Sequence, residues 1–390
     1  MSVGPAGLPG PAWEQIRQGR APDVESLGRV AGAGLATLGL TGVAMVHEGL
    51  RSRLLGAGPL EPLLADDEVS DVAVNGDGSV WVDRGRGMER VEMDLGGPEA
   101  RRQLAVRLAG LAGRRLDETA PYVDGQLPSG VRLHAILPPL VAGGPHLTLR
   151  VPARARASLT DLGDRGLFPA RWQGVLRALV ARRVAFVISG GTGAGKTTLL
   201  GALLAEAGAD ERLVVVEDVR ELRVDHGHVI RLEARPANVE GAGEVTLTTL
   251  VRQALRMRPD RLIVGEVRGA EVRELLAALN TGHEGGCGTV HANAAADVVA
   301  RFEALGALAD LGPSAVHAQL VSAVDVVIHL RRSGSEGRTT RRIESIGVLA
   351  CSSLGRPGVT EALRWDGSTE QRGPGWPRLA GLLGLAVDGS

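Results

Sequence analysis

The sequence predicts an α/β fold, in which a domain with a mostly parallel sheet is preceded by a smaller α+β domain. In the second half of the chain, short apolar runs alternate with helical segments such as residues 198–207 and 271–279. Continuous apolar runs between helices are typical of strands buried on both faces of a parallel sheet. These runs cover residues 184–188, 213–216, 262–264 and 324–330. A length of 390 residues is enough for two domains with separate cores.

The first half of the chain carries the signals of a smaller mixed domain. Residues 69–74 and 80–83 flank the turn-forming sequence Asn-Gly-Asp-Gly, which predicts a β-hairpin. Leucines at helical spacing follow over residues 99–111, and residues 147–151 alternate apolar and polar as a strand does. We therefore expect an α+β domain over residues 51–152.

The remaining segments are less clearly patterned. Residues 1–50 are rich in glycine, alanine and proline, and we expect a poorly defined extension there. A linker is predicted over residues 153–170, followed by the parallel-sheet domain over residues 171–335. Residues 336–390 are polar and rich in glycine, so we expect a variable C-terminal tail with one edge strand at 343–349.

The composition excludes several classes of protein. Apolar residues make up 44% and charged residues 23%, as in soluble globular proteins, and the net charge of −1 gives no overall basic field. Aromatic residues are only 2%, which disfavours nucleic acid as a partner without ruling it out. The two cysteines favour a reducing compartment. Residues 30–46 carry no charge, but they are too short and glycine-rich for a spanning helix, so we expect at most a peripheral membrane contact.

A phosphate-binding loop is the clearest motif. The sequence Gly-Gly-Thr-Gly-Ala-Gly-Lys-Thr follows an apolar run and precedes a helical segment, as the P-loop pattern requires. Its glycines let successive N–H groups point at phosphate oxygens, and the helix N-terminus adds partial positive charge. The predicted nucleotide-binding residues are Gly190, Gly191, Thr192, Gly193, Ala194, Gly195, Lys196, Thr197 and Thr198.

Two residues of this loop predict ATP and Mg²⁺ as cofactors. Lys196 would place its charge on the β- and γ-phosphates, and the Thr197 hydroxyl would bind Mg²⁺. Lys196 is the only lysine among 44 basic residues. Arginine is bulkier and planar, so it fits this cradle poorly, which explains why lysine remains here.

Carboxylates follow two of the predicted strands. Glu217 and Asp218 end one apolar run, with Glu221 close behind, and Glu266 follows another. In open α/β sheets the ligand lies beyond the carboxyl ends of the strands, where carboxylates hold Mg²⁺ or accept a proton from attacking water. Taken alone, the first cluster is equally compatible with a solvated acidic turn. Glu266 resembles a Walker B acid, which would act on Mg²⁺ mainly through its waters.

The glycine-rich segment at residues 280–293 has three interpretations. His283, Cys287 and His291 are candidate zinc ligands, although their spacing is not a usual zinc pattern. The two histidines are also compatible with solvent-facing or core positions. The third interpretation is a loop that senses phosphate beside the P-loop.

In combination, these motifs resemble the type II/IV secretion-system ATPase family, and most closely the tight-adherence (Flp) pilus-assembly and conjugal-transfer-associated ATPases. The resemblance rests on the P-loop, the acidic strand end and residues 255–261, 264–269 and 280–293, and covers roughly residues 59–330. In the first half, residues 58–64, 74–76, 113–117 and 132–134 also match.

The resemblance implies a role for each motif. It implies a RecA-like P-loop NTPase domain, with Lys196 and Thr197 as Walker A. Glu217, Asp218 and Glu221 would form the acidic box, in which Glu221 activates water. Glu266 would be the Walker B acid, and His283 and His291 the histidine box. Arg132 and Arg150 match arginines that reach the phosphates from the N-terminal domain.

The resemblance also implies a biological role. It implies a hexameric motor at the cytoplasmic face of the bacterial inner membrane, which hydrolyses ATP with Mg²⁺ to power pilus assembly or protein secretion through a membrane platform protein. Two alternatives stay open. One is a conjugation-type motor that moves DNA, and the other is a nucleotide-gated scaffold that binds ATP without hydrolysing it.

Overall fold

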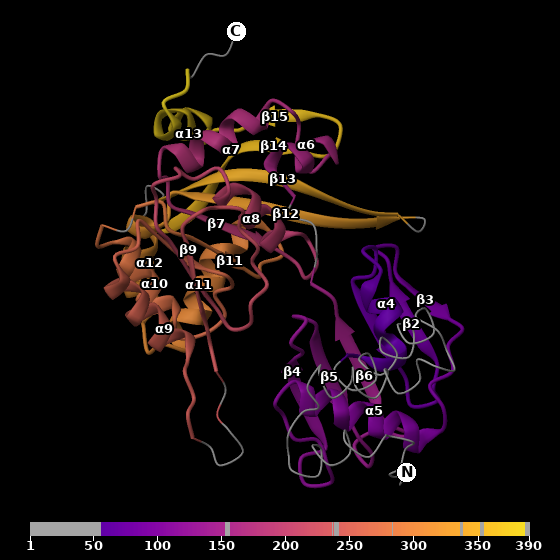
Figure 1. Ribbon diagram of the computed structural model, residues 1–390. Coiled ribbons are helices and arrows are strands. Elements are labelled where there is room, and N and C mark those ends of the chain that lie inside the picture. The colour runs from indigo at the N-terminus through magenta and orange to yellow at the C-terminus, as the bar shows by residue number, and fades with distance from the viewer. Residues whose placement is uncertain are drawn as a thin grey trace. The chain divides into compact units, whose positions relative to one another are not determined.

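The computed structural model describes residues 56–152, 157–235, 237, 242–282, 284–335, 338–351 and 355–386. The chain divides into two compact units, Met1–Arg154 and Ala155–Ser390 (Figure 1). The expected extension at 1–50 and the uncharged stretch at 30–46 lie outside the described residues. In the part of the chain that is described, no helix is long and apolar enough to cross a membrane.

The first unit is built on a six-stranded sheet in the order β3-β2-β1-β6-β5-β4. Each strand runs antiparallel to its neighbours. The elements are η1 (Gly58–Leu60), α4 (Glu61–Ala65), β1 (Asp71–Val74), β2 (Val80–Asp83), β3 (Met88–Val91), α5 (Pro98–Leu111), β4 (Tyr122–Gln126), β5 (Arg132–Ile136) and β6 (His146–Arg150). The hairpin of β1 and β2, the helix α5 and the strand β6 confirm the elements expected in this half.

One face of this sheet is apolar and the other is polar. Val72, Leu133 and Leu149 are buried in one cluster with Leu104 and Leu108 of α5. Because side chains alternate along a strand, the residues between them point to the opposite face, where most are polar. This alternation is the pattern from which the strands of this unit were expected.

The second unit is built on a nine-stranded sheet in the order β15-β14-β13-β12-β7-β11-β10-β8-β9. From β12 to β9, neighbouring strands are parallel, whereas β13 to β15 are antiparallel additions. The strands are β7 (Phe186–Gly190), β8 (Leu213–Glu217), β9 (Val229–Glu233), β10 (Arg261–Val264), β11 (Cys287–Val290), β12 (Val326–Ser335), β13 (Arg338–Cys351), β14 (Pro357–Trp365) and β15 (Glu370–Arg372).

Helices cover both faces of this sheet, as Figure 1 shows. One buried cluster joins the sheet to α6 (Leu159–Asp164), α7 (Trp172–Ala181), α8 (Lys196–Leu204) and α13 (Trp376–Leu383). The other joins it to α9 (Leu247–Ala254), α10 (Val272–Leu279), α11 (Val298–Ala307) and α12 (Pro313–Ala323). The described part of this unit also contains the 3₁₀ turns η2 (Leu255–Met257) and η3 (Ala295–Asp297). Burial on both faces explains the continuous apolar runs of β7, β8 and β10.

The structure extends the second unit beyond the limits expected from the sequence. Residues 157–170, expected as a linker, include α6, whose Leu159 and Leu162 are buried in this unit's core. Residues 338–386, for which we expected one edge strand, form three strands and a helix. The strand expected at 343–349 lies within β13, whereas β14 and β15 were missed because their sequences contain no continuous apolar run. In α13, Trp376, Leu379 and Leu383 are buried in the core.

Candidate functional site

The P-loop connects β7 to α8 in the second unit. Gly190 ends β7 with φ 151°, and Gly193 and Gly195 have φ 69° and 98°. These are conformations that residues with a Cβ rarely adopt. At Gly190 a Cβ would also lie 2.6 Å from the Leu330 carbonyl oxygen, so the strand beside the loop leaves no space for a side chain. The loop therefore needs the glycines that the motif supplies.

Lys196 is the first residue of α8, and its ammonium group folds back over the loop. Its Nζ donates to the carbonyl oxygens of Gly190 at 3.0 Å and Gly191 at 2.9 Å. The side chain is only 7% exposed, and burial lowers the pKa of Lys196, while the carboxylates of Glu266 and Glu221 raise it. A buried cation held by two carbonyls is suited to binding an anion brought to the loop.

A chain of polar contacts links Lys196 to Glu266 through His291. Lys196 Nζ lies 3.4 Å from His291 Nδ1, and His291 Nε2 lies 3.1 Å from Glu266 Oε1. A neutral imidazole with its proton on Nε2 is compatible with both contacts, since Nδ1 is then free to accept from Lys196 and the N–H is on the side of Glu266. Burial and the charge of Lys196 lower the pKa of His291, whereas Glu266 raises it. The parallel strands β10 and β11 bring Glu266 and His291 to the same edge of the sheet.

Glu217 ends β8 and is buried beneath this edge, with 4% of its surface exposed. Its Oε1 accepts hydrogen bonds from the backbone N–H groups of Glu221 at 3.1 Å and Leu222 at 2.7 Å. Its Oε2 has no hydrogen-bond partner among the described residues. Burial raises the pKa of Glu217 to about 7, against the effect of the two N–H groups.

Glu217 therefore contacts the backbone of two turns, one leading to Glu221 and the other to Glu266. It holds the turn leading to Glu221, and a Cβ on Gly265 would lie 2.7 Å from Glu217 Cγ. Gly265 immediately precedes Glu266, so the packing of Glu217 against Gly265 restricts the position of the turn that carries Glu266. Glu217 was expected among the catalytic residues, and its geometry suits positioning of Glu221 and Glu266.

The other predicted residues of this edge are more exposed. Glu221 is exposed, and its charge raises the pKa of both Lys196 and Glu217. Asp218 forms an ion pair with Arg268. Thr197 is half-buried in the first turn of α8, and Thr198 beside it is exposed. The sheet thus brings the P-loop, Glu221, Glu266 and His291 to one edge, as strands ending together would do.

The remaining parts of the predicted histidine segment differ from one another. His283 lies outside the described residues. Cys287 is buried in the core as the first residue of β11, where burial raises the pKa of its thiol to about 12. Within the described residues, no group of three or more His, Cys, Asp or Glu side chains is arranged to hold a metal ion.

Arg132 and Arg150 are direct neighbours on the first unit's sheet. They are paired across β5 and β6 and therefore share a face. Arg150 Nε lies 3.1 Å from Asp71 Oδ1 on β1. Like charges directly opposite each other are destabilising, and Asp71 offsets the charge of Arg150. The pairing was not foreseen, because the sequence does not give strand register.

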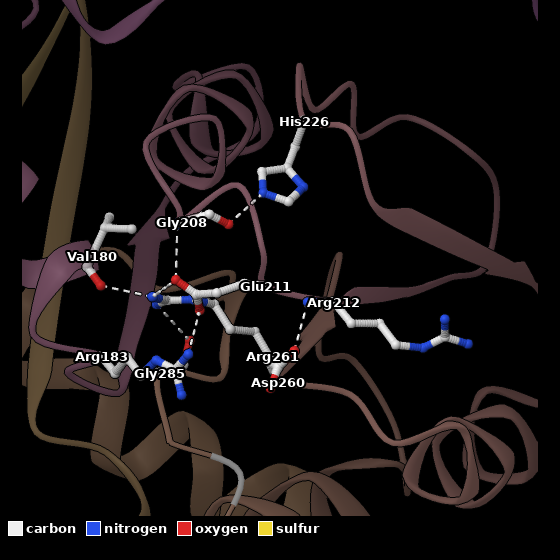
Figure 2. Close-up of polar contacts among 9 residues, drawn as sticks. All are labelled: Val180, Arg183, Gly208, Glu211, Arg212, His226, Asp260, Arg261 and Gly285. Carbon is white, nitrogen blue, oxygen red and sulfur yellow. Dashed lines mark hydrogen bonds and ion pairs between the residues drawn. The ribbon is translucent and has the colours of Figure 1, made fainter.

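A buried ion pair that sequence reasoning missed lies where β10 begins, at the opposite end of that strand from Glu266 (Figure 2). Arg261 is 1% exposed, and its Nε and Nη2 donate to the two carboxylate oxygens of Glu211 at 2.7 and 3.0 Å. Burial alone would raise the pKa of Glu211, but the hydrogen bonds and charge of Arg261 hold it below its usual value. No sequence motif marks this pair, because an arginine and an acid 50 residues apart occur in almost any sequence.

Further contacts of Arg261 join three segments of the chain. Its Nη2 donates to the Val180 carbonyl at 2.7 Å, and its Nη1 lies 3.5 Å from the Gly285 carbonyl. Gly285 has no room for a side chain, because a Cβ would lie 2.6 Å from Arg261 Nη1. The ion pair therefore fixes the end of α7 and the residues that lead into β11, at whose far end His291 lies.

Comparison with known proteins identifies the family. Residues 53–371 match the family described as type II/IV secretion system protein. The chain belongs to this family.

Relatives of the chain are named for conjugal transfer and for secretion. The chain is 53% identical over 306 residues to a Mycobacterium tuberculosis protein named for conjugal transfer, which covers 77% of this chain and 86% of that protein. It is 34% identical over 285 residues to the conjugal transfer protein TrbB of Rhizobium radiobacter, covering 72% and 84%. With the type IV secretion system protein PtlH of Bordetella pertussis it shares 33% identity over 313 residues, covering 73% and 92%.

Solved structures share the fold. The pilus retraction motor PilT with bound ADP matches with a TM-score of 0.54 and 19% identity, over 76% of this chain and 83% of that one. The Legionella pneumophila ATPase DotB matches with a TM-score of 0.51 and 18% identity, over 79% and 80%. The expected fold, a RecA-like α/β domain preceded by a smaller α+β domain, is confirmed, and so is the resemblance to the secretion ATPases.

Proposed function

We propose that this protein is a Mg²⁺-dependent ATPase that works as a hexameric ring at the cytoplasmic face of the bacterial inner membrane. The observation that carries the proposal is the chain of contacts from Lys196 through His291 to Glu266, which joins the P-loop to the ends of β10 and β11. A phosphate sensor, a cation and an acid linked in this way can respond together to the γ-phosphate of a nucleotide.

The residues at this edge divide the chemistry of hydrolysis. The N–H groups of the P-loop and the Lys196 ammonium bind the β- and γ-phosphates. Glu221, exposed at the same edge, takes the proton of the attacking water, and Glu217 holds the turn that carries it. His291 in its neutral form joins Lys196 to Glu266 and so reports whether phosphate is bound.

The side chains at the loop fit a bound Mg²⁺. The Thr197 hydroxyl and the Glu266 carboxylate offer oxygen ligands, which Mg²⁺ prefers over nitrogen or sulfur. When bound, Mg²⁺ would neutralise charge on the β- and γ-phosphates. The exposure of Glu266, at 42%, suits contact with the ion through water.

The proposed role is to power pilus assembly or protein secretion through a membrane platform protein. Relatives named for secretion and the fold shared with a pilus motor support it. A second candidate is a conjugation motor that moves DNA, which the relatives named for conjugal transfer favour. The net charge of −1 supports the first candidate, since a DNA motor gains affinity from neutralising phosphates.

Lys196→Ala tests the ATPase proposal. Purified wild-type protein should hydrolyse ATP in Mg²⁺, and the variant should lose hydrolysis and most of its nucleotide affinity, because the charge facing the phosphates is gone. Arg331→Ala, on an exposed part of β12, serves as a matched control and should keep full turnover. Equal turnover by wild type and Lys196→Ala would refute the proposal. Stimulation of the wild type by DNA would favour the conjugation motor.

A further inference from the structure

The hairpin of β12 and β13 projects past the strand that carries the P-loop. Residues 326–330 of β12 pair with β7, and Leu330 pairs with Gly190, where β7 ends. The last five residues of β12, from Arg331 to Ser335, continue paired with β13 alone. Figure 1 shows the two long strands extending beyond the rest of the sheet. The hairpin therefore runs on beside the loop that follows Gly190.

Two arginines on this hairpin face the P-loop. Arg332 on β12 and Arg341 on β13 are paired with each other across the strands. Arg341 Nε donates to the carbonyl oxygen of Gly193 at 2.8 Å. A Cβ built on Gly193 would lie 2.8 Å from Arg332 Nη1, so this guanidinium group lies against the loop as well. The two cationic groups thus reach the same glycine, in the middle of the P-loop, from two strands.

The charge of Arg332 is not offset as that of its neighbour Arg331 is. Arg331, one residue earlier and on the opposite face of β12, has its Nη1 2.8 Å from Glu344 Oε1. Among the described residues, the side chain of Arg332 has no hydrogen-bond or ion-pair partner. Arg341 lies directly opposite it, and the buried ammonium of Lys196 lies on the same loop. An anion bound at this loop would give the guanidinium group of Arg332 a partner.

We propose that Arg332 and Arg341 form a second cationic contact for the phosphate chain of the bound nucleotide, supplied by the C-terminal hairpin of the same chain. The inference rests on the proposed ATPase function and extends it to residues outside the P-loop. Guanidinium groups make bidentate hydrogen bonds to phosphate oxygens, so the pair adds affinity and orientation. Arg341 also holds the Gly193 carbonyl, which shapes the loop before nucleotide arrives.

The test is nucleotide affinity in full-length variants. Isothermal titration of the wild type, Arg332→Ala, Arg341→Ala and the double variant would use ATP, ADP and AMP in Mg²⁺. We expect a loss of affinity for ATP of about tenfold in the double variant, because two charged contacts are removed, with a smaller loss for ADP and the smallest for AMP. Arg341→Lys should recover part of the loss, since it restores charge without the planar fork. Arg331→Ala is the matched control and should bind as the wild type does.

The outcomes separate this inference from the function on which it rests. If the wild type and Lys196→Ala both fail to bind ATP, the proposed function is wrong. If the wild type binds, Lys196→Ala does not, and the double arginine variant binds ATP within twofold of the wild type, only the inference is overturned. An equal loss for ATP and AMP would also overturn it, because a phosphate contact must depend on the number of phosphates. Thermal unfolding without nucleotide checks that the hairpin variants are folded.

Discussion

The two ends of strand β10 use charged residues in opposite ways. Where the strand begins, Arg261 and Glu211 are buried together, and both carboxylate oxygens of Glu211 are bonded to the guanidinium group. Beyond the other end, Lys196, His291 and Glu266 form a looser chain that reaches solvent, and one oxygen of Glu217 has no partner in the described part of the chain. The first arrangement is complete within the protein. The second leaves polar groups with capacity to bind something else.

This difference assigns the charged residues at the start of β10 to stability and those beyond its end to function. Buried polar groups without partners are costly, so natural proteins contain few of them, and those that persist are often at functional sites. A buried ion pair, in contrast, contributes little net stability but is costly to break, because removing one partner leaves the other charge buried. Substitutions beyond the end of β10 should therefore change activity, and substitutions at its start should change stability.

The largest expected effect is on hydrolysis, in Glu221→Gln and Glu266→Gln. An amide cannot accept the proton of attacking water, so Glu221→Gln should lower kcat by roughly 10²–10⁴ while ATP still binds. Glu266→Gln should also trap ATP, with altered dependence on Mg²⁺. Single-turnover assays separate binding from chemistry. Normal hydrolysis by Glu221→Gln would make Glu217 or Glu266 the leading candidate for the base.

The next effect is on stability, at the start of β10. Arg261→Ala should lower the free energy of unfolding by up to about 3–5 kcal/mol, since Glu211 would remain buried with only the more distant, partly exposed Arg183 as an ion-pair partner. Arg177→Ala is the control, because it removes a half-exposed ion pair with Glu206 and should cost at most about 1 kcal/mol. Denaturant unfolding measures both.

A double substitution shows whether stability depends on the Arg261–Glu211 ion pair itself or only on not leaving one of its charges buried alone. Arg261→Met with Glu211→Leu should be much less destabilising than Arg261→Ala, because neither charge is left buried. If the double variant is as unstable as the single one, the contacts of Arg261 with Val180 and Gly285 carry the stability instead.

A smaller effect is the pH dependence that Glu217 gives to stability. Its pKa is raised from 4.5 to about 7 in the folded protein, so the folded state binds the proton more tightly than the unfolded state. Stability is therefore highest at low pH with respect to this group, and it falls as pH rises from about 4.5 to about 7. The loss is on the order of 3 kcal/mol.

Glu217→Gln isolates this contribution. The amide does not titrate, so the variant does not lose stability as pH rises. The unfolding free energy of the variant minus that of the wild type should therefore increase from pH 5 to pH 8, the range spanned by the raised pKa of Glu217. Urea unfolding at several pH values measures it, and taking the difference cancels the titration of other groups. A difference that does not change with pH would contradict a raised pKa.

Much of the second unit was predictable because its signals are local. The runs that became β7, β8 and β10 are apolar throughout, and the P-loop glycines are required by local backbone geometry. β11 was missed because it consists of Cys-Gly-Thr-Val, of which only two residues are strongly apolar, although it lies in the middle of the parallel sheet. It could be recognised only from its neighbours β7 and β10.

The contacts that hold the site together were not predictable, because they depend on register and burial. Which arginines face each other across a hairpin follows from strand pairing, as for Arg332 and Arg341. The spacing of Glu217 from Glu221 is visible in the sequence, but the burial that turns Glu217 into a support for the turn is not. The roles of Arg132 and Arg150 stay predictions from the resemblance. What the structure adds is that the two residues are paired across β5 and β6.

The smallest expected effect concerns Arg132 and Arg150. It tests whether the first unit contributes positive charge to catalysis. We expect each alanine variant to lower kcat by at least about tenfold, because guanidinium groups that reach the γ-phosphate stabilise charge that grows as the bond breaks. Thermal stability should not fall, since the Arg150 ion pair with Asp71 is half-exposed and the two arginines repel each other. Steady-state ATPase assays and thermal unfolding provide the two measurements.

Arg90→Ala is the matched control, because Arg90 is an exposed arginine on the same sheet, with only a distant contact to Glu92 at 3.8 Å. A catalytic role predicts lower kcat in Arg132→Ala and Arg150→Ala with ATP affinity nearly unchanged, and no change in Arg90→Ala. A purely structural role predicts a lower unfolding temperature with kcat retained in the folded fraction. If the fragment beginning near Ser158 hydrolyses ATP at the full-length rate, the first unit supplies no catalytic group. The groups beyond the end of β10 would then be sufficient for the chemistry.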